Sequence, residues 1–170
     1  EAQDWLLSQE NNFRLVVFPI GGEGITYVWP KGYSGVELSN QLLSSPSISF
    51  NTNTPFYNGV SQSLEKIFLA RGNFSKIMDF LNSKYLVVRS DIDWKTRGMR
   101  NPQVIEDRMQ ELKSSGKFKM VKQLGSLQFW ENLDWAGDYF RDELEHEVLV
   151  SFNIVDTVMS LVKEKEMVKY

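Results

Sequence analysis

The stretch KYLVVRS, Lys84–Ser90, carries the clearest strand signal in this sequence. Its run of one Tyr, one Leu and two Val residues is bounded by charged residues and predicts a buried central strand. The earlier stretch FRLVVFPI, residues 13–20, has the same β-branched character and predicts a second buried strand. Because helical patterns separate these two strands, we expect an α/β domain.

Four segments have the periodicity of helices. Residues 2–10 fit a short helix, and Asn101 can cap a longer one that has Pro102 at its first position and ends at Gly116. In that longer helix we expect an inward stripe of Val104, Ile105, Met109 and Leu112. The inward residues expected in the other two helices are Val60, Leu64, Ile67 and Phe68 before Gly72, and Ile77, Phe80 and Leu81 within residues 73–83.

Shorter elements complete the predicted fold. Residues 46–50 are a candidate strand, residues 51–55 a turn, and Gly125 with Ser126 separates two runs that predict an antiparallel hairpin. The final segment, from about residue 148, favours a short strand followed by a helix. The expected fold class is therefore α/β (mixed α+β): a single compact domain over residues 1–170, with a central mixed sheet, helices packed on it and a C-terminal hairpin plus helix.

The composition is that of a globular chain. The 170 residues are 42% hydrophobic and 24% charged, and the net charge of −3 carries no broad basic field, which argues against nucleic acid as a partner. The absence of cysteine excludes disulfides, zinc–cysteine sites and thiol catalysis. No apolar run approaches the roughly 18 residues of a membrane-spanning helix. Because the chain begins at Glu1, without methionine or signal peptide, we expect it to come from a longer protein.

Gly22 and Gly24, with Glu23 between them, follow a predicted strand, as a Gly-x-Gly pair does in nucleotide-binding loops. A dinucleotide fingerprint needs a third glycine and a helix that begins at the phosphate, whereas the following ITYVW, residues 25–29, is extended in character. We therefore interpret this stretch as a glycine-rich turn with aromatic side chains packed nearby.

Asp91 and Asp93 follow the central strand as an Asp-x-Asp pair. Two carboxylates so placed can hold a divalent cation such as Mn²⁺ or Mg²⁺ in sugar-nucleotide transferases, although a turn-capping role for Asp91 is the simpler interpretation. The single histidine, His146, lies in an acidic segment, so no histidine cluster is available as a metal or catalytic site. We predict no catalytic residue, no metal and no cofactor, and keep the divalent cation on Asp91 and Asp93 as the alternative.

Aromatic residues gather in the segments that follow the strands. Ligands of α/β domains collect at the carboxyl ends of strands, where these loops are expected, and flat aromatic faces can stack on sugar rings or contact a membrane interface. The alternative is that the rings only form satellite hydrophobic clusters under the loops. The candidate glycan- or acceptor-binding residues are Tyr27, Trp29, Tyr33, Tyr57 and Trp94, with Glu23 and Asp91 as polar partners.

The order of short motifs resembles a known family. DWL (4–6), FRLVVFP (13–19), YVWPKGYSG (27–35), PFYN (55–58), LNSKYLVVRSD (81–91) and LGSLQFWEN (124–132) follow one another as in the extracytoplasmic domain of YfhO-like, GT-C-type polytopic membrane glycosyltransferases. The resemblance covers about residues 4–135 and leaves residues 136–170 as an extension of uncertain role. More distantly, the layout is similar to the soluble domain of the oligosaccharyltransferase catalytic subunit, but the Trp-Trp-Asp-Tyr-Gly motif is missing, so acceptor-peptide recognition is not carried over.

The resemblance implies that this chain is not catalytic by itself. In GT-C enzymes the catalytic acid and the lipid-linked donor site belong to the membrane part, so the partner would be the membrane-embedded remainder of the same polypeptide, together with a glycan or glycolipid. The expected location is the extracytoplasmic face of the cell membrane. Two other hypotheses stay open: a stand-alone metal-dependent sugar-nucleotide transferase that uses Asp91 and Asp93, and a protein-interaction module of a surface assembly.

Overall fold

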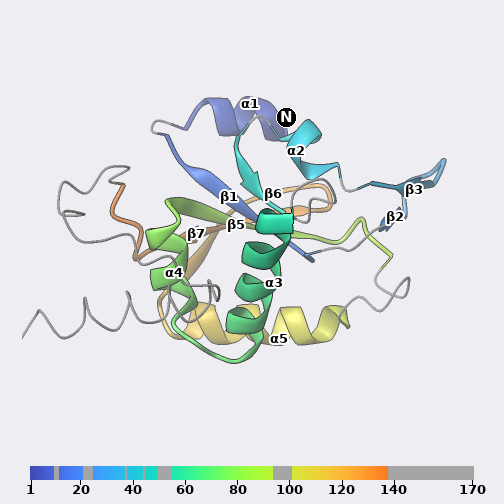
Figure 1. Cartoon of the computed structure of the whole chain (residues 1–170). Helices are drawn as coiled ribbons and strands as arrows, with labels where there is room; N and C mark the ends of the chain where they lie inside the picture. The colour runs from blue at the N-terminus through green and yellow to red at the C-terminus, as the bar shows by residue number, and fades with distance from the viewer. Residues whose placement is uncertain are drawn as a thin grey trace, which may run out of the picture.

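A five-stranded mixed sheet forms the centre of the molecule (Figure 1). The computed structural model describes residues 1–9, 12–20, 25–36, 38–43, 45–49, 55–93 and 101–137. The strands of this sheet, in spatial order, are β4 (Ser47–Ile48), β1 (Arg14–Phe18), β5 (Ser83–Arg89), β7 (Leu127–Asn132) and β6 (Phe118–Leu124). Strands β4, β1 and β5 are parallel, whereas β7 is antiparallel to both β5 and β6. The mixed α/β class and the central position of β5 are thus confirmed.

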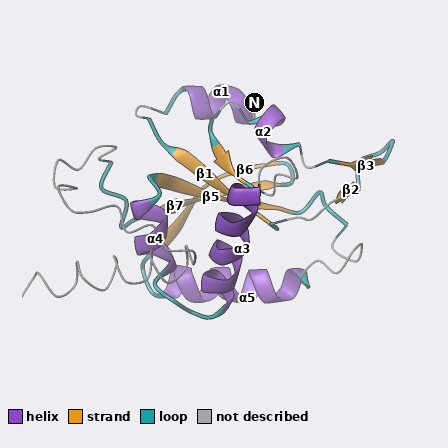
Figure 2. Ribbon diagram, viewed as in Figure 1, coloured by secondary structure: helices purple, strands orange, loops and turns teal. Residues whose placement is uncertain are grey.

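Helices cover both faces of the sheet (Figure 2). Their bounds are α1 (Ala2–Leu7), α2 (Ser39–Leu42), α3 (Pro55–Leu69), α4 (Phe74–Phe80) and α5 (Pro102–Ser114). Residues alternate between the two faces along each strand, so Leu86 packs with α3, α4 and α5, while Tyr85 and Val87 pack in a second cluster with Leu6 of α1. The two cores therefore lie on opposite sides of one sheet, in a three-layer arrangement.

The residues expected to begin and end α5, and to form the turn between β6 and β7, occupy those positions. The side chain of Asn101 accepts a hydrogen bond from the backbone N–H of Gln103 at 3.0 Å, and Pro102 begins the helix. Gly116 ends it with a φ of +72°, and Gly125 takes a φ of +57° in the hairpin turn. Both glycines occupy the left-handed region, where a side chain is disfavoured.

Two predicted core residues are exposed instead. Phe80 of α4 is 40% exposed and Val104 of α5 is 45% exposed. Successive helical residues are rotated by about 100°, so Val104 is turned roughly 100° away from the buried Ile105 of the next position. Phe80 is displaced by a similar angle from the stripe that Phe74, Ile77 and Met78 bury. In α5 the expected stripe was therefore too wide by one residue, whereas in α4 it included Phe80 and missed the buried Phe74 and Met78.

A second, two-stranded sheet projects from the body of the domain (Figure 1). Strand β2 (Ile25–Tyr27) pairs antiparallel with β3 (Tyr33–Gly35). The extended character expected for residues 25–29 is confirmed over β2, but the hairpin itself was not predicted. Residues 51–54 of the turn expected at 51–55, and the expected C-terminal strand and helix, lie outside the described residues, whereas Pro55 is the first residue of α3. In the described part of the chain, no helix has the length and apolar character to cross a bilayer.

Candidate functional site

The β2–β3 hairpin sits at the carboxyl end of the central strand. After β5 ends at Arg89, the chain runs alongside β2, where Tyr27 forms an antiparallel bridge with Ile92. The N–H of Val28 donates to the carbonyl oxygen of Asp91 at 2.9 Å, and the N–H of Asp93 donates to that of Thr26 at 2.8 Å. These backbone contacts bring the predicted aromatic loop and the predicted Asp-x-Asp segment together.

Three of the predicted aromatic residues form one cluster. The ring centroids of Tyr27 and Trp29 are 4.4 Å apart, those of Tyr27 and Tyr33 are 5.6 Å apart, and those of Trp29 and Tyr33 are 6.1 Å apart in a stacked arrangement. Tyr27 is buried, whereas Trp29 and Tyr33 are each half-buried. A Cβ at Gly35 would lie 2.6 Å from the Tyr33 hydroxyl oxygen, so this glycine leaves the space that the Tyr33 ring occupies.

A buried ion pair anchors the cluster to the end of β5. Arg89 Nε and Nη2 donate to the two carboxylate oxygens of Asp91 at 2.9 and 2.8 Å, a bidentate geometry. The Arg89 side chain is only 3% exposed. Trp29 Nε1 donates to the same carboxylate at 2.9 Å, so Asp91 accepts from both the strand and the aromatic loop. The orientation of the Trp29 indole is therefore fixed by the ion pair.

Arg89 also contacts the supporting elements around it. Its Nη1 donates to the Ser39 hydroxyl of α2 at 2.7 Å, and its guanidinium carbon lies 4.8 Å from the centroid of the Tyr27 ring. The Tyr27 hydroxyl oxygen is 3.4 Å from Arg89 Nη1 and accepts from the N–H of Leu38 at 2.9 Å. One side chain thus joins β5, α2 and the hairpin, with polar partners that offset its loss of hydration.

The ion pair keeps Asp91 ionised. Burial alone would raise the pKa of Asp91, but the hydrogen bonds and the positive charge of Arg89, followed by the hydrogen bond from Trp29, outweigh it. The net effect is a pKa below the ordinary aspartate value. A negative charge is therefore present at this position at neutral pH, and the guanidinium beside it balances that charge.

The remaining candidate residues are less fully described. Glu23 and Trp94 lie outside the described residues, and Tyr57 belongs to α3, although only its backbone is described. Asp93 contributes its N–H to the pairing with β2. Among the described residues, no group of three or more Asp, Glu or His side chains is arranged to hold a metal ion. The ligand-binding role of all these residues stays a prediction.

Sequence reasoning missed Arg89 as the partner of Asp91. The signal was present, because an arginine at the end of a buried apolar strand needs an anion, and Asp91 stands two residues later. It also missed Ser39, whose short helix has no strong helical pattern in the sequence. The turn of the hairpin had a signal as well, since Pro30 and Gly32 occupy the second and fourth positions typical of a tight turn.

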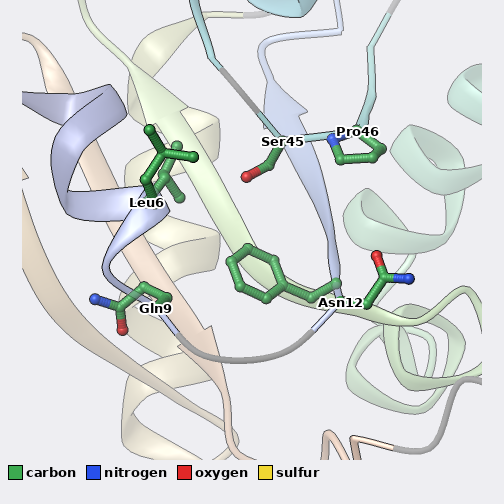
Figure 3. A pocket seen from close by; sticks show the side chains of 7 residues that line it. Leu6, Gln9, Asn12, Ser45 and Pro46 are labelled. Atoms are coloured by element: carbon green, nitrogen blue, oxygen red, sulfur yellow. The ribbon is translucent and has the colours of Figure 1, made fainter.

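A small cavity of about 210 Å³ lies at the opposite end of the parallel strands from the hairpin (Figure 3). It opens between α1 and the residues that precede β1 and β4, at the amino ends of these parallel strands. Its lining residues are Leu6, Leu7, Gln9, Asn12, Phe13, Ser45 and Pro46. The amide of Gln9 is engaged by its neighbours, because it accepts from the Tyr85 hydroxyl and donates to the Trp5 carbonyl, each at 3.2 Å. None of the predicted site residues lines this cavity.

Two solved structures resemble the domain. Both are cryo-EM structures of arabinofuranosyltransferase AftD from mycobacteria, the second being a mutant form. The TM-scores are 0.59 and 0.58, and each match has 16% sequence identity over 76% of this chain and 12% of AftD. At this identity the likeness is one of fold alone, to a small part of a much larger glycosyltransferase. No protein-family model matches the sequence, and no curated protein is significantly similar to it.

Proposed function

We propose that this chain is a non-catalytic extracytoplasmic domain of a polytopic, glycosyltransferase-like membrane protein, and that it assists recognition of an acceptor or glycan at the cell surface. The observation that carries the proposal is the aromatic cluster of Tyr27, Trp29 and Tyr33, which the Arg89–Asp91 pair holds at the carboxyl end of β5. The order of sequence motifs and the fold shared with part of AftD support it. In this proposal the membrane-embedded remainder of the polypeptide carries the chemistry.

In this proposal some of the predicted residues contact the ligand and others position them. Trp29 and Tyr33 are half-buried, and in this proposal the ring surface that they leave accessible contacts a sugar ring. The hydrogen bond to Asp91 fixes the Trp29 rotamer before any ligand arrives, so that binding costs less side-chain entropy. Tyr27 and Asp91 are buried and act as positioning residues. Glu23, Tyr57 and Trp94 remain proposed contributors from neighbouring segments.

Saturation-transfer NMR tests the proposal directly. Arabinofuranosyl oligosaccharides are the first probe, because AftD is an arabinofuranosyltransferase, and glucopyranosyl oligosaccharides of equal length are the comparison. We expect saturation transfer to sugar protons that falls at least fivefold in Tyr33→Ala and Trp29→Ala. The matched control is Phe80→Ala, which removes an exposed aromatic ring from α4. A third variant, Gly35→Ala, should also weaken transfer, because its new methyl group displaces the Tyr33 ring.

Two outcomes would contradict the proposed site. One is the absence of transfer to any tested sugar, and the other is transfer that Phe80→Ala reduces as much as Tyr33→Ala. Because Trp29→Ala also removes a hydrogen bond to Asp91, its fold is checked by its amide spectrum before the comparison is made. Tyr33→Ala leaves the Arg89–Asp91 pair in place, so a loss of transfer in this variant reports the missing ring and not a disturbed fold.

The metal-dependent alternative gains no support from the geometry. Both carboxylate oxygens of Asp91 accept from Arg89, and one also accepts from Trp29, so a cation there would have to displace a buried guanidinium. Manganese titration distinguishes the metal-dependent transferase from the non-catalytic domain. For the non-catalytic domain we expect no rise in Tm, whereas a bound cation would add stability by mass action. Light scattering over a range of protein concentrations tests the third hypothesis, an interaction module.

A further inference from the structure

The β2–β3 hairpin has a second face that the aromatic cluster does not use. Ile25 and Tyr27 point into the cluster, so the alternate residues of the same strand point away from it. On this outer face Val28 is 61% exposed and Val36 is 52% exposed. Figure 1 shows the hairpin standing out from the body of the domain. Two aliphatic side chains are therefore presented to the surroundings on a projecting ribbon.

The two hydroxyl groups between these valines on the outer face form a hydrogen bond with each other. The hydroxyl oxygens of Thr26 and Ser34, which are cross-strand partners, lie 3.1 Å apart and share a hydrogen bond. A hydroxyl that keeps a partner costs much less to remove from water than one that loses its hydrogen bond. The stripe formed by Val28, Thr26, Ser34 and Val36, here called the outer stripe, is thus suited to a less polar environment than bulk water.

The tip of the hairpin adds one positive charge. The N–H of Gly32 donates to the carbonyl oxygen of Trp29 at 2.8 Å and closes a turn with Pro30 and Lys31 at its exposed corner. Gly32 has a φ of +63°, which suits the last position of such a turn. Residues 25–36 contain no carboxylate, and the nearest acidic residues in the sequence, Glu23 and Glu37, lie outside this segment.

We propose that the outer stripe and Lys31 contact the surface of a bilayer rich in anionic phospholipid. The valine side chains would enter the boundary between headgroups and acyl chains, and the Lys31 ammonium would lie near lipid phosphates. The charge of the tip selects this partner, because residues 28–32 combine the exposed Val28 side chain with the Lys31 ammonium and contain no carboxylate, whereas Glu23 and Glu37 lie at the base of the hairpin sequence. The contact is independent of the glycan proposal, since it uses the opposite face of the hairpin from Tyr27 and Tyr33.

Such a contact is weak and calls for a method that detects weak binding. One basic residue near an anionic surface contributes about 1 kcal/mol, equivalent to roughly a fivefold change in affinity. We would therefore record amide spectra of the protein with phosphatidylglycerol-containing nanodiscs that carry a spin-labelled lipid. Amides between Val28 and Val36 should broaden, and nanodiscs of phosphatidylcholine alone should bind roughly fivefold more weakly.

Variants locate the contact. Val28→Asp combined with Val36→Asp should abolish the broadening, and Lys31→Glu should weaken binding at least fivefold on anionic nanodiscs while changing it little on neutral ones. The matched control is Val104→Asp, which places a charge at an exposed valine of α5. Because these side chains are exposed, each variant should keep the wild-type amide spectrum elsewhere.

Three results would overturn the proposal: no broadening on anionic nanodiscs, broadening centred on other residues, or equal loss of binding in Val104→Asp. Because the oligosaccharide and nanodisc experiments use different probes and variants, a negative result in one does not affect the interpretation of the other.

Discussion

Removal of the Asp91 carboxylate provides the sharpest test of the structure. In Asp91→Ala the Arg89 guanidinium loses two charge-assisted hydrogen bonds while its side chain stays 3% exposed, and Trp29 Nε1 loses its acceptor. Breaking a buried pair by deleting one partner costs about 3–5 kcal/mol, mostly because a charge is left buried without compensation. That is a large share of the roughly 5–15 kcal/mol that stabilises a typical domain.

The assay is urea unfolding, followed by far-UV circular dichroism and tryptophan fluorescence. Asp91→Asn keeps an acceptor for Trp29 and for one Arg89 donor but also leaves the guanidinium without a counter-charge, so its loss should lie at the lower end of the same range, about 3 kcal/mol. The double variant Arg89→Met, Asp91→Leu should be more stable than Asp91→Ala, because it removes the stranded charge together with its partner. A cost below about 1 kcal/mol for Asp91→Ala, or a double variant less stable than the single one, would contradict a stabilising role for the buried pair.

Three further predictions concern other parts of the fold. Burial opposes ionisation of Asp134, but hydrogen bonds from Ser75 and Lys117 outweigh it and lower its pKa. The ionised carboxylate therefore stabilises the folded protein above the unfolded pKa of about 3.9, and this contribution is lost as the pH falls through the folded pKa. Unfolding measured from pH 6 to 2 should therefore show a shallower acid loss in Asp134→Asn. Burial raises the pKa of Tyr85 to about 12, so stability should fall as the pH rises from 10 to 12, by roughly 1.4 kcal/mol per unit, and Tyr85→Phe should remove that slope. Asn101→Ala should cost about 1 kcal/mol in urea unfolding, because it deletes the cap of α5, and Asn101→Ser should restore most of it.

The elements with strong local signals could be predicted from the sequence. Strands β1 and β5 are apolar runs, α5 carries its own cap and first-turn proline, and the Gly125–Ser126 pair sets the β6–β7 hairpin. These features depend on neighbours in the chain, so a local reading finds them. Phe80 and Val104 were misplaced because helical position alone does not say how wide a buried stripe the neighbouring elements cover.

The location of several candidate residues was predictable from the sequence, but their connections were not, and their role in binding stays a prediction. Tyr27, Trp29, Tyr33 and Asp91 were expected in loops near the carboxyl ends of the strands, since ligands gather there in α/β folds. The hydrogen bond from Trp29 to Asp91 joins residues 62 positions apart, and no local pattern indicates such a pairing. Ser39 shares this difficulty, because its contact with Arg89 depends on how α2 folds over the sheet.

The parallel pairing of β1 with β5 has a consequence for how the chain is made. Leu15 has its strand partner at Tyr85, about 70 residues later, whereas β6 and β7 are joined by a tight turn. At roughly 5–20 residues per second, a ribosome needs about 4–14 s to supply that partner. During this interval the apolar strand from Leu15 to Phe18 is without its central neighbour, while the β6–β7 hairpin, once synthesised, forms within microseconds. Strand β1 therefore waits for its partner for seconds during synthesis, a time in which unpaired apolar strands are prone to aggregate.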